Sequence, residues 1–475
     1  MKNQTQENTY KEHVNDIFES QKKAFKKYGQ PSLGTRKIAL GKLLDNILMY
    51  KNEIIQAISR DFGHRSYHES LMGEIFCCVN AIKHTRNNLN KWMKPQKRSV
   101  PWYLQPGEAK IYYQPLGVVG IVAPWNYPFQ LCIGPLIPAI AAGNRVMLKP
   151  SGQTPETANI IDKIISKIFD PNEVSTIKGP EANDFFIHLP FDHLLYTGST
   201  RVGKIVMKAA ANNLTPVTLE LGGKSPAIIA EDYPINKAAS SIVAGKLFNA
   251  GQSCIAPNHV LVPKDKIIEF INQVKKQANK FYPTIIDNAD YTSIISEKRY
   301  NQILDMIDDA KVKGAKVEYT HQQEKSNREI KKIIPALILN VNDSMKIMQE
   351  EIFGPVLPVI PYDEIYDAIE YVEKHPKPLA IYCFSNDTDI TDTVIRTTTS
   401  GGGCVNDTLI HFIQDDLPFG GVGPSGMGRY HGFFGFQTFS NIKGIFHQSR
   451  FNMISSFQPP YGKLFNRMSN FLIGK

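Results

Sequence analysis

The stretch Phe248-Asn249-Ala250-Gly251-Gln252-Ser253-Cys254-Ile255-Ala256-Pro257 places one thiol among small and polar residues and ends in a proline. A thiolate is a strong nucleophile, and small neighbours leave room for a substrate beside it. A single cysteine is also compatible with an inert core residue, because free cysteines are often buried. The stretch therefore needs a second signal before it predicts chemistry.

That second signal is a carboxylate 34 positions upstream of Cys254, in the stretch Leu219-Glu220-Leu221-Gly222-Gly223-Lys224-Ser225-Pro226. Glu220 follows the apolar run Val217-Thr218-Leu219. Burial of a carboxylic acid raises its pKa toward values that suit a general base. The two stretches thus contain a candidate nucleophile and a candidate base.

The composition is that of an ordinary globular protein. The 475 residues are 42% hydrophobic and 21% charged, which allows up to about three domains with a large core. Only two of the six cysteines are close in sequence, and adjacent residues do not make a metal-ligand spacing. We therefore expect free thiols in a reducing, cytoplasmic compartment and no metal site. The cysteines are Cys77, Cys78, Cys132, Cys254, Cys383 and Cys404.

Membrane insertion and nucleic-acid binding are both disfavoured. Residues 1–8 are polar, so no signal peptide is expected, and no run of about 18 apolar residues predicts a membrane-spanning helix. The net charge of +9 comes from scattered lysines rather than from a clustered basic motif, so we expect no nucleic-acid partner.

Hydrophobic periodicity predicts an α/β fold. Residues 1–95 are predicted to be helical, with a helix end at Gly63, and the proline-rich residues 94–115 predict a connection or an exposed hairpin. The lysine-rich residues 311–332 predict an exposed loop or hairpin. From Gly117, short apolar runs alternate with helical stretches, which is typical of parallel sheets. The predicted strands are Val118–Val122, Val146–Leu148, His193–Thr197, Val217–Leu221 and Ala227–Ala230, then Val260–Val262, Ala336–Leu339, Val356–Ile360, Ala380–Phe384 and Cys404–Val405.

One strand–turn–helix unit has the character of a phosphate site. His193–Gly203 combines a strand, a sharp turn at Gly198 and a helix start in which Gly203 lets the helix approach the sheet. The N–H groups at such a helix end suit a pyrophosphate, although a turn without a ligand has the same pattern. Asn126 and Lys149 follow two other predicted strands, at the sheet edge where ligands bind in open α/β folds.

These features, in this order, resemble the aldehyde dehydrogenase superfamily over about residues 30–450. The C-terminal third is similar to the class 3 branch and to coniferyl aldehyde dehydrogenases. The resemblance implies a Rossmann-like cofactor domain, an α/β catalytic domain and a small bridging or oligomerisation element. It rests on the two stretches around Cys254 and Glu220, and on Pro124–Pro128, Lys149–Ser151, Gln349–Pro358, Cys404–Asp407 and Leu417–Gly432.

The resemblance also implies roles for individual residues. Cys254 would attack the aldehyde carbon, and the Asn126 amide with the Cys254 backbone N–H would hold the oxyanion. A hydride would pass to NAD or NADP, and Glu220 would activate the water that hydrolyses the thioester to the acid. The implied cofactor-binding residues are Lys149, Gly198, Ser199, Gly203, Glu351 and Phe353.

One position departs from the family pattern. Many relatives carry a glutamate after Lys149-Pro150-Ser151 that binds the adenosine ribose, whereas this chain has Gly152. Loss of the carboxylate removes a partner for the ribose and also a repulsion against a 2′-phosphate. The sequence therefore leaves the choice between NAD and NADP open.

Other functions compete with this interpretation. A Cys-dependent hydrolase or acyltransferase would pair Cys254 with a histidine, and neither active-site stretch contains one. A binding protein that kept only the fold would be expected to have lost Cys254 or Glu220. Within the family, branch similarity favours aromatic or medium- to long-chain aliphatic aldehydes, and a semialdehyde is the alternative substrate.

The expected domains are a cofactor-binding domain (1–95 and 115–221), a catalytic domain (222–407) and a bridging element with the tail (96–114 and 432–475). Class 3 relatives suggest a homodimer. In the segment Lys463–Lys475, apolar residues recur at helical spacing beside basic ones, which predicts an amphipathic helix. That helix is expected either to pack on its own subunit or the dimer partner, or to lie on an anionic membrane surface.

Overall fold

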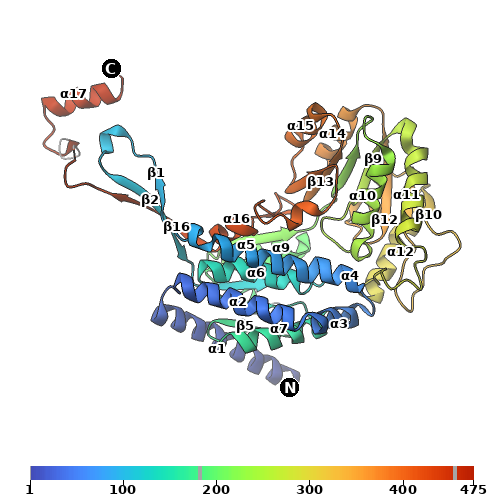
Figure 1. Ribbon diagram of the computed structural model, residues 1–475, viewed down its shortest axis with the longest axis horizontal. Helices are drawn as coiled ribbons and strands as arrows, with labels where there is room; N and C mark the ends of the chain where they lie inside the picture. Colours follow the sequence, from blue (N-terminus) through green and yellow to red (C-terminus); the bar gives the residue numbers. More distant parts are fainter. Residues whose placement is uncertain (1, 180–184, 453–456, 475) are drawn as a thin grey trace.

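The predicted apolar runs form two mostly parallel sheets, and a third, smaller sheet projects from them (Figure 1). The structure is a computed structural model that describes residues 2–179, 185–452 and 457–474. We call the three parts the six-stranded unit, the seven-stranded unit and the arm. The α/β class predicted from the sequence is confirmed.

The six-stranded unit has the strand order β15-β7-β6-β3-β4-β5. Its neighbours run parallel, except that β15 is antiparallel to β7 and sets Gly426 opposite Glu220. Its central strands are continuous apolar runs, as expected where helices cover both faces of a parallel sheet. The strands are β3 Val118–Val122, β4 Arg145–Lys149, β5 Val174–Thr176, β6 His193–Gly198, β7 Val217–Leu221 and β15 Gly426–Met427.

Helices cover both faces of this sheet. On one face, Phe18 of α1 (Lys2–Tyr28) and Val206 of α9 (Thr200–Ala211) share a core cluster with the strands. The predicted helix end at Gly63 is confirmed, since α3 ends one residue earlier and Gly63 has a φ of +81°. The helices on the other face and the layer outside it are α2 Leu33–Met49, α3 Lys51–Phe62, α4 Tyr67–Ser70, the π-helix η1 Leu71–Phe76, α5 Cys77–Trp92, α6 Gln130–Ala142 and α7 Pro155–Ile168.

The seven-stranded unit has the order β10-β11-β12-β9-β8-β13-β14, parallel except for β10 at one edge. Helices α10 (Ile235–Leu247) and α11 (Ile267–Phe281) pack on one face, and α14 (Ile365–Lys374) and α15 (Thr388–Thr397) on the other. The remaining helices and the strands are α12 Glu297–Val312, α13 Lys346–Gln349, β8 Pro226–Ile229, β9 His259–Pro263, β10 Lys316–Tyr319, β11 Ala336–Leu339, β12 Val356–Tyr362, β13 Ala380–Phe384 and β14 Gly402–Val405.

Residues 311–332 contribute to a hairpin, one of their two predicted forms, because β10 pairs antiparallel with β11, the next strand along the chain. Their predicted exposure does not hold throughout. The Lys332 side chain is buried, and its Nζ donates to the carbonyl oxygens of Ile286 and Asn288 at 3.0 and 2.7 Å. The lysine in β10 itself agrees with the place of this strand at the edge of the sheet, because edge strands commonly carry charged side chains.

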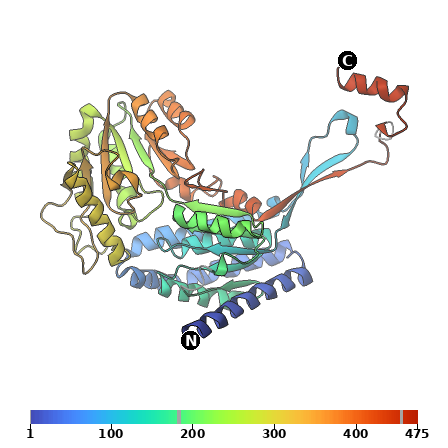
Figure 2. The same ribbon diagram turned by 180° about the vertical axis from the view of Figure 1, so that it is seen from behind.

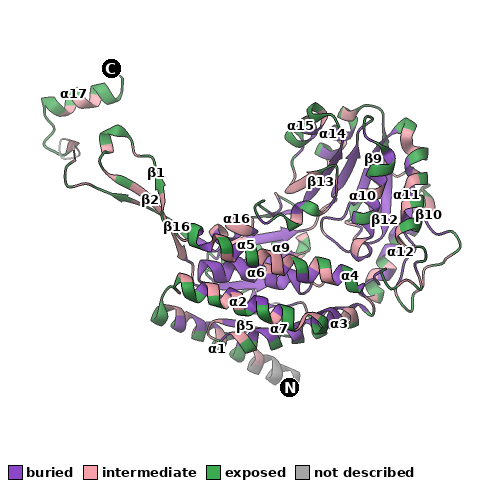
Figure 3. Ribbon diagram, viewed as in Figure 1, coloured by how far each residue is buried: buried purple, intermediate pink, exposed green. Residues whose placement is uncertain are grey.

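The arm is an antiparallel sheet of β1 (Gln96–Arg98), β2 (Glu108–Pro115) and β16 (Ser440–His447) that stands clear of both units (Figure 2). The proline-rich residues 94–115 therefore form a hairpin, one of their two predicted forms. The predicted tail helix is present as α17 (Lys463–Leu472) near the tip of the arm. Most of the arm and α17 are exposed or half-buried (Figure 3).

Candidate active site

The backbone turns sharply between α10 and Cys254. Asn249, Ala250 and Gly251 have positive φ angles of 54°, 50° and 75°. Two of them carry a side chain, and such residues persist in this region only where their surroundings hold them. Gly251 also touches the backbone opposite, because a Cβ there would lie 2.4 Å from the carbonyl oxygen of Gly354. The turn therefore brings the Cys254 loop tightly against a second loop of the seven-stranded unit.

Buried amide groups hold this turn in place. Asn249 Nδ2 donates to the carbonyl oxygen of Asn126 at 3.0 Å. Gln252 Nε2 donates to the carbonyl oxygens of Asn249 and Ser293, and its Oε1 accepts from the N–H of Ile295 at 2.9 Å. Removing one partner of such a buried pair is costly. Sequence reasoning missed these two roles, although both amides stand in the stretch that it singled out.

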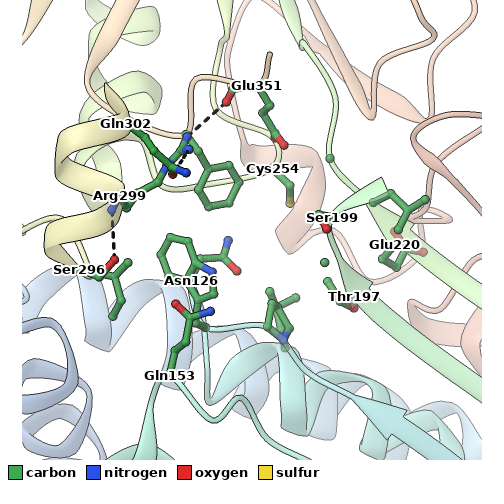
Figure 4. Close-up of a pocket in the computed structure, with 18 of the residues that line it drawn as sticks. Asn126, Gln153, Thr197, Ser199, Glu220, Cys254, Ser296, Arg299, Gln302 and Glu351 are labelled. Carbon is green, nitrogen blue, oxygen red and sulfur yellow. Dashed lines mark hydrogen bonds between the residues drawn. The ribbon is translucent and has the colours of Figure 1, made fainter. Parts of the chain in front are cut away.

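A cleft of about 360 Å³ opens between the two units, and Cys254 lies on its wall (Figure 4). One wall comes from the carboxyl ends of β3, β6 and β7, and the other from α12 and the loop before β12. We call it the polar cleft. Eight further residues of interest line it: Trp125, Asn126, Gly198, Ser199, Glu220, Arg299, Glu351 and Phe353.

Glu220 lies at the carboxyl end of β7 with its side chain turned into the protein. The residue is 3% exposed, and neither carboxyl oxygen has a hydrogen-bond partner among the described residues. Burial raises its pKa well above the ordinary value, and the charge of Arg429 opposes this rise. A buried carboxyl group with both oxygens available can accept a hydrogen bond from a water and take its proton.

The surroundings of Cys254 favour the neutral thiol over the thiolate. Burial is the main cause that raises its pKa, and the neighbouring carboxyl groups of Glu351 and Glu220 raise it further. The thiolate is the reactive form of a cysteine. Attack by Cys254 therefore requires removal of the thiol proton as the new bond forms.

Asn126 faces Cys254 across the polar cleft (Figure 4). The residue is 3% exposed, and its Nδ2 donates to the carbonyl oxygen of Gln252 at 3.2 Å. A primary amide nitrogen carries two hydrogens, so one remains for a group bound in the cleft. The arrangement supplies a fixed donor beside the thiol.

The loop after β6 has the features of a phosphate site. Ser199 is the N-cap of α9, so the first N–H groups of that helix face the cleft. Gly198 packs closely, since a Cβ there would lie 2.2 Å from the hydroxyl oxygen of Tyr196. The Thr197 hydroxyl lines the same cleft, buried and without a hydrogen-bond partner among the described residues.

Glu351 and Phe353 lie on the opposite wall. Burial raises the pKa of Glu351 to about 7, while the Gly223 N–H and the Arg299 charge oppose the rise. Its Oε1 is buried without a described partner. The Phe353 ring packs against Trp125 with 5.4 Å between ring centres. Unpartnered oxygens, a helix N-terminus at the cleft and an aromatic wall fit a dinucleotide.

Two predicted cofactor residues lie behind the cleft wall. Lys149 is fully buried, and its Nζ donates to the carbonyl oxygen of Pro150 at 3.0 Å. Gly203 lies within α9, where a Cβ would be 2.6 Å from Leu221 Cδ2, so it lets the helix approach the sheet. A direct contact of either residue with a cofactor stays a prediction.

A second cavity of about 200 Å³ also reaches Cys254, and its lining contains no Asp, Glu, Lys, Arg or His. We call it the apolar tunnel. A Cβ at Gly73 would lie 3.1 and 3.2 Å from two rings of its wall, which stack at 15°. Sequence reasoning did not find this tunnel, because its wall is assembled from distant segments: Met72, Phe76, Tyr127, Phe248, Ile410 and Phe412.

Neither cavity has a histidine in its lining, so Cys254 lacks the partner that a Cys–His hydrolase needs. Within residues 2–179, 185–452 and 457–474, no group of three or more His, Cys, Asp or Glu side chains could hold a metal ion. In the same residues, every helix is too short or too polar to cross a bilayer.

Comparison with known proteins gives consistent matches. The aldehyde dehydrogenase family model matches residues 3–445. A probable coniferyl aldehyde dehydrogenase of Pseudomonas aeruginosa is 48% identical, covering 95% of this chain and 94% of that protein. Aldehyde dehydrogenase family 3 member A2 of Pongo abelii is 40% identical, covering 82% of this chain and 79% of that protein.

Solved structures agree. The substrate-bound state of Staphylococcus aureus AldH has a TM-score of 0.91 and 39% identity, covering 97% of this chain and 99% of that one. The NAD+ complex of a Bacillus cereus aldehyde dehydrogenase has a TM-score of 0.83 and 26% identity, covering 93% of this chain and 89% of that one.

Proposed function

The chain belongs to the aldehyde dehydrogenase family, and we propose that it oxidises apolar aldehydes at Cys254, where the polar cleft meets the apolar tunnel. It is an NAD(P)-dependent oxidoreductase similar to the class 3 branch. The observation that carries the proposal is that Cys254 lines both cavities, so a substrate in one can react beside a group held in the other.

The first step is addition of the thiol to the aldehyde. The Cys254 sulfur bonds to the carbonyl carbon as the C=O π bond opens, and the thiol proton moves to the carbonyl oxygen to give a thiohemiacetal. The free hydrogen of the Asn126 amide and the Cys254 backbone N–H stabilise that oxygen. Such fixed donors favour the transition state because they need no reorganisation as charge develops.

The polar cleft is suited to a dinucleotide cofactor, because buried oxygens of Thr197 and Glu351 lack hydrogen-bond partners among the described residues and the N-terminus of α9 faces the same cleft. When bound, the cofactor would supply the hydride acceptor. The thiohemiacetal carbon would give up its hydride and the hydroxyl group would release its proton to solvent, which leaves the acyl group as a thioester on Cys254. The residues proposed to hold the cofactor are Lys149, Gly198, Ser199, Gly203, Glu351 and Phe353.

Glu220 completes the cycle. It takes a proton from a water as the water oxygen adds to the thioester carbon. The C–S bond then breaks and Glu220 returns the proton to the sulfur, which releases the acid and restores the Cys254 thiol. The raised pKa suits this role, because burial makes the Glu220 carboxylate a stronger base than an exposed carboxylate.

The wall of the tunnel supports an aromatic or medium- to long-chain aliphatic aldehyde. A substrate with a carboxylate, such as a semialdehyde, would need a cation, and the tunnel lining holds no Lys or Arg. The similar Pseudomonas aeruginosa protein is described as a probable coniferyl aldehyde dehydrogenase, which points to an aromatic substrate.

We propose the same division of the chain as in the sequence analysis: 1–95 and 115–221 bind cofactor, 222–407 carry catalysis, and 96–114 with 432–475 bridge. The arm supports a homodimer, because an exposed three-stranded sheet that stands clear of its own units offers edges to a second copy. A monomer in light scattering at micromolar concentration would contradict the dimer.

A substrate panel tests the function directly. Purified protein is mixed with a cinnamyl-type aldehyde, octanal or succinic semialdehyde, each with NAD or NADP, and absorbance of the reduced cofactor is followed. The first two aldehydes should have the higher kcat/KM. No reduction with any aldehyde would contradict the proposed activity, and preference for the semialdehyde would contradict the substrate class.

A further inference from the structure

We propose that Arg65 is a positioning residue for aldehyde oxidation, because its guanidinium group holds the backbone of Asn126 and so aims the oxyanion-binding amide. The proposal rests on the proposed role of Asn126. Arg65 lies between α3 and α4 of the six-stranded unit, and its side chain is fully buried.

The Arg65 guanidinium joins two parts of the protein at one nitrogen. Its Nη1 donates to the carbonyl oxygen of Asn126 at 3.0 Å and to Glu74 Oε1 at 2.8 Å. Both side chains of the ion pair are 0% exposed. A buried charge pair with such geometry fixes its neighbours, because each partner left alone would be an uncompensated buried charge.

Glu74 fixes the far end of the same loop. Its Oε2 accepts from the N–H groups of Phe129 and Gln130 at 3.1 and 2.7 Å, where α6 begins. Arg65 and Glu74 together therefore hold the loop that carries Asn126 at its middle and at its end. While the Arg65–Glu74 ion pair is intact, the Asn126 loop is tied to the start of α6.

The seven-stranded unit holds Asn126 from the opposite side. The Asn126 carbonyl oxygen accepts from Asn249 Nδ2 at 3.0 Å as well as from Arg65, and its Nδ2 donates to the carbonyl oxygen of Gln252. The residue therefore sits at the junction of the two units. Without the Arg65 bond, the hydrogen bonds of Asn126 itself to other described residues would be those to Asn249 and Gln252, both in the loop that carries Cys254.

The flat face of the guanidinium also reaches the tunnel wall. Its central carbon lies 4.9 Å from the Phe62 ring centre and 4.8 Å from that of Tyr127. Tyr127 in turn stacks on Phe248 in the apolar tunnel. Arg65 thus backs both the oxyanion donor and one wall of the tunnel, and its replacement should affect acylation rather than cofactor binding.

The chain supplies a matched control for a purely structural role. Arg36 is 3% exposed in the same unit, and it donates to the carbonyl oxygens of Ala141 and Pro31 at 2.8 and 3.0 Å. Arg36 belongs to α2 and contacts the C-terminal end of α6, whereas Asn126 precedes the N-terminal end of that helix. A variant of Arg36 therefore removes a buried arginine without touching the loop.

The experiment compares Arg65→Met, Arg65→Lys, Arg36→Met and Asn126→Ala in the full-length protein. Single-turnover cofactor reduction, NAD binding by fluorescence and thermal melting are measured for each. Asn126→Ala should slow the single turnover by about 10²–10³-fold, as loss of an oxyanion donor does. Arg65→Met should slow it by roughly 10–100-fold through misplacement of that donor, with NAD binding unchanged.

Arg65→Lys should recover part of the rate, because lysine keeps a charged donor beside Glu74 but lacks the flat guanidinium face that packs on the Phe62 and Tyr127 rings. Arg36→Met should melt earlier yet react at the wild-type rate per folded molecule. Equal slowing by Arg65→Met and Arg36→Met would overturn the proposal. If Arg65→Met does not fold, an unchanged rate in Arg65→Lys overturns it instead. A normal rate in Asn126→Ala would refute the proposed oxyanion role itself.

Discussion

The two cavities that meet at Cys254 have different walls. The lining of the polar cleft includes the acidic residues Glu220 and Glu351 and the basic residue Arg299, whereas the lining of the apolar tunnel contains no Asp, Glu, Lys, Arg or His. We infer that the polar cleft serves the reaction itself and that the apolar tunnel selects the aldehyde. A change in the cleft should alter the reaction with every aldehyde, and a change in the tunnel should alter the ranking of aldehydes.

The first prediction concerns Cys254, the residue that both cavities share. Cys254→Ala should lower turnover by roughly 10⁴-fold or more with every aldehyde, because no other nucleophile can form the thioester. NAD should still bind, since the cofactor contacts are elsewhere in the cleft. Reduced-cofactor absorbance and fluorescence titration measure the two effects. Residual turnover that differs between aldehydes would argue against a shared nucleophile.

The second prediction separates two steps within the polar cleft. Glu220→Gln should keep the single turnover of cofactor reduction and lower steady-state turnover by about 10²–10⁴-fold, because only thioester hydrolysis needs the base. Rapid-mixing and steady-state assays compare the two rates. Equal loss of both rates would show that Glu220 serves the first step as well.

The pH dependence tests the same assignment. Burial raises the Glu220 pKa, so at low pH the carboxyl group is protonated and cannot accept a proton. Turnover of the wild type should therefore rise with pH through that raised pKa, above the usual carboxyl range. Glu220→Gln should lack this acidic limb.

The contrast between the cavities also explains what the sequence could predict. Strands such as Val118–Val122 and Ala380–Phe384 were predicted with the bounds that they have, because a continuous apolar run is a local signal. Many residues of the polar cleft stand in short sequence motifs. Glu220 near the end of β7 and Cys254 in the loop after α10 are examples, and both line the cleft.

The apolar tunnel and Arg65, which packs behind its wall, had no comparable signal in the sequence. Met72, Tyr127 and Phe412 come together only by tertiary packing, and each alone is an ordinary apolar residue. Arg65, a single arginine beside a helix end, has the sequence character of a surface residue, and its burial depends on Glu74 nine positions later. Long-range pairing, like that of β2 with β16, is likewise not a local property.

The third prediction returns to the cleft and to the cofactor. Gly152 is exposed and carries no carboxylate to repel a 2′-phosphate. NADP should be accepted with a kcat/KM within roughly 100-fold of NAD, a gap of about 2.7 kcal/mol. Gly152→Glu should widen the preference for NAD. A larger gap in the wild type would mean that another group excludes the phosphate.

The fourth prediction sharpens the other side of the comparison. In Gly73→Ala the added Cβ would press on the Tyr127 and Phe248 rings at 3.1 and 3.2 Å. The kcat/KM of a bulky aromatic aldehyde should fall by roughly 10-fold, a typical effect of small volume changes in an apolar pocket, while propanal should be unaffected. Gly34→Ala is the control, because its Cβ meets only Ser32 Oγ at 3.6 Å. Equal effects on both aldehydes would contradict a tunnel role.

The last prediction concerns the apolar face of the tail helix α17, which packs either on the protein or on a membrane surface. Phe471 of α17 lies 6.0 Å from the Trp102 ring of the arm, which supports packing within the subunit, but Phe471 is still 73% exposed and Leu464 60%. We expect that the full chain and a chain truncated after Gly462 both stay in the supernatant with anionic liposomes at low salt. Turnover of a water-soluble aldehyde should then differ by less than about twofold, because the tail does not reach the reacting atoms. If the full chain sediments with the liposomes and the truncated chain does not, the result would favour a membrane-surface helix, in which apolar burial and the charges of Lys463 and Arg467 act together. In that case the tunnel would take lipid-derived aldehydes from a bilayer, and the full chain should oxidise liposome-borne substrate faster than the truncated chain does.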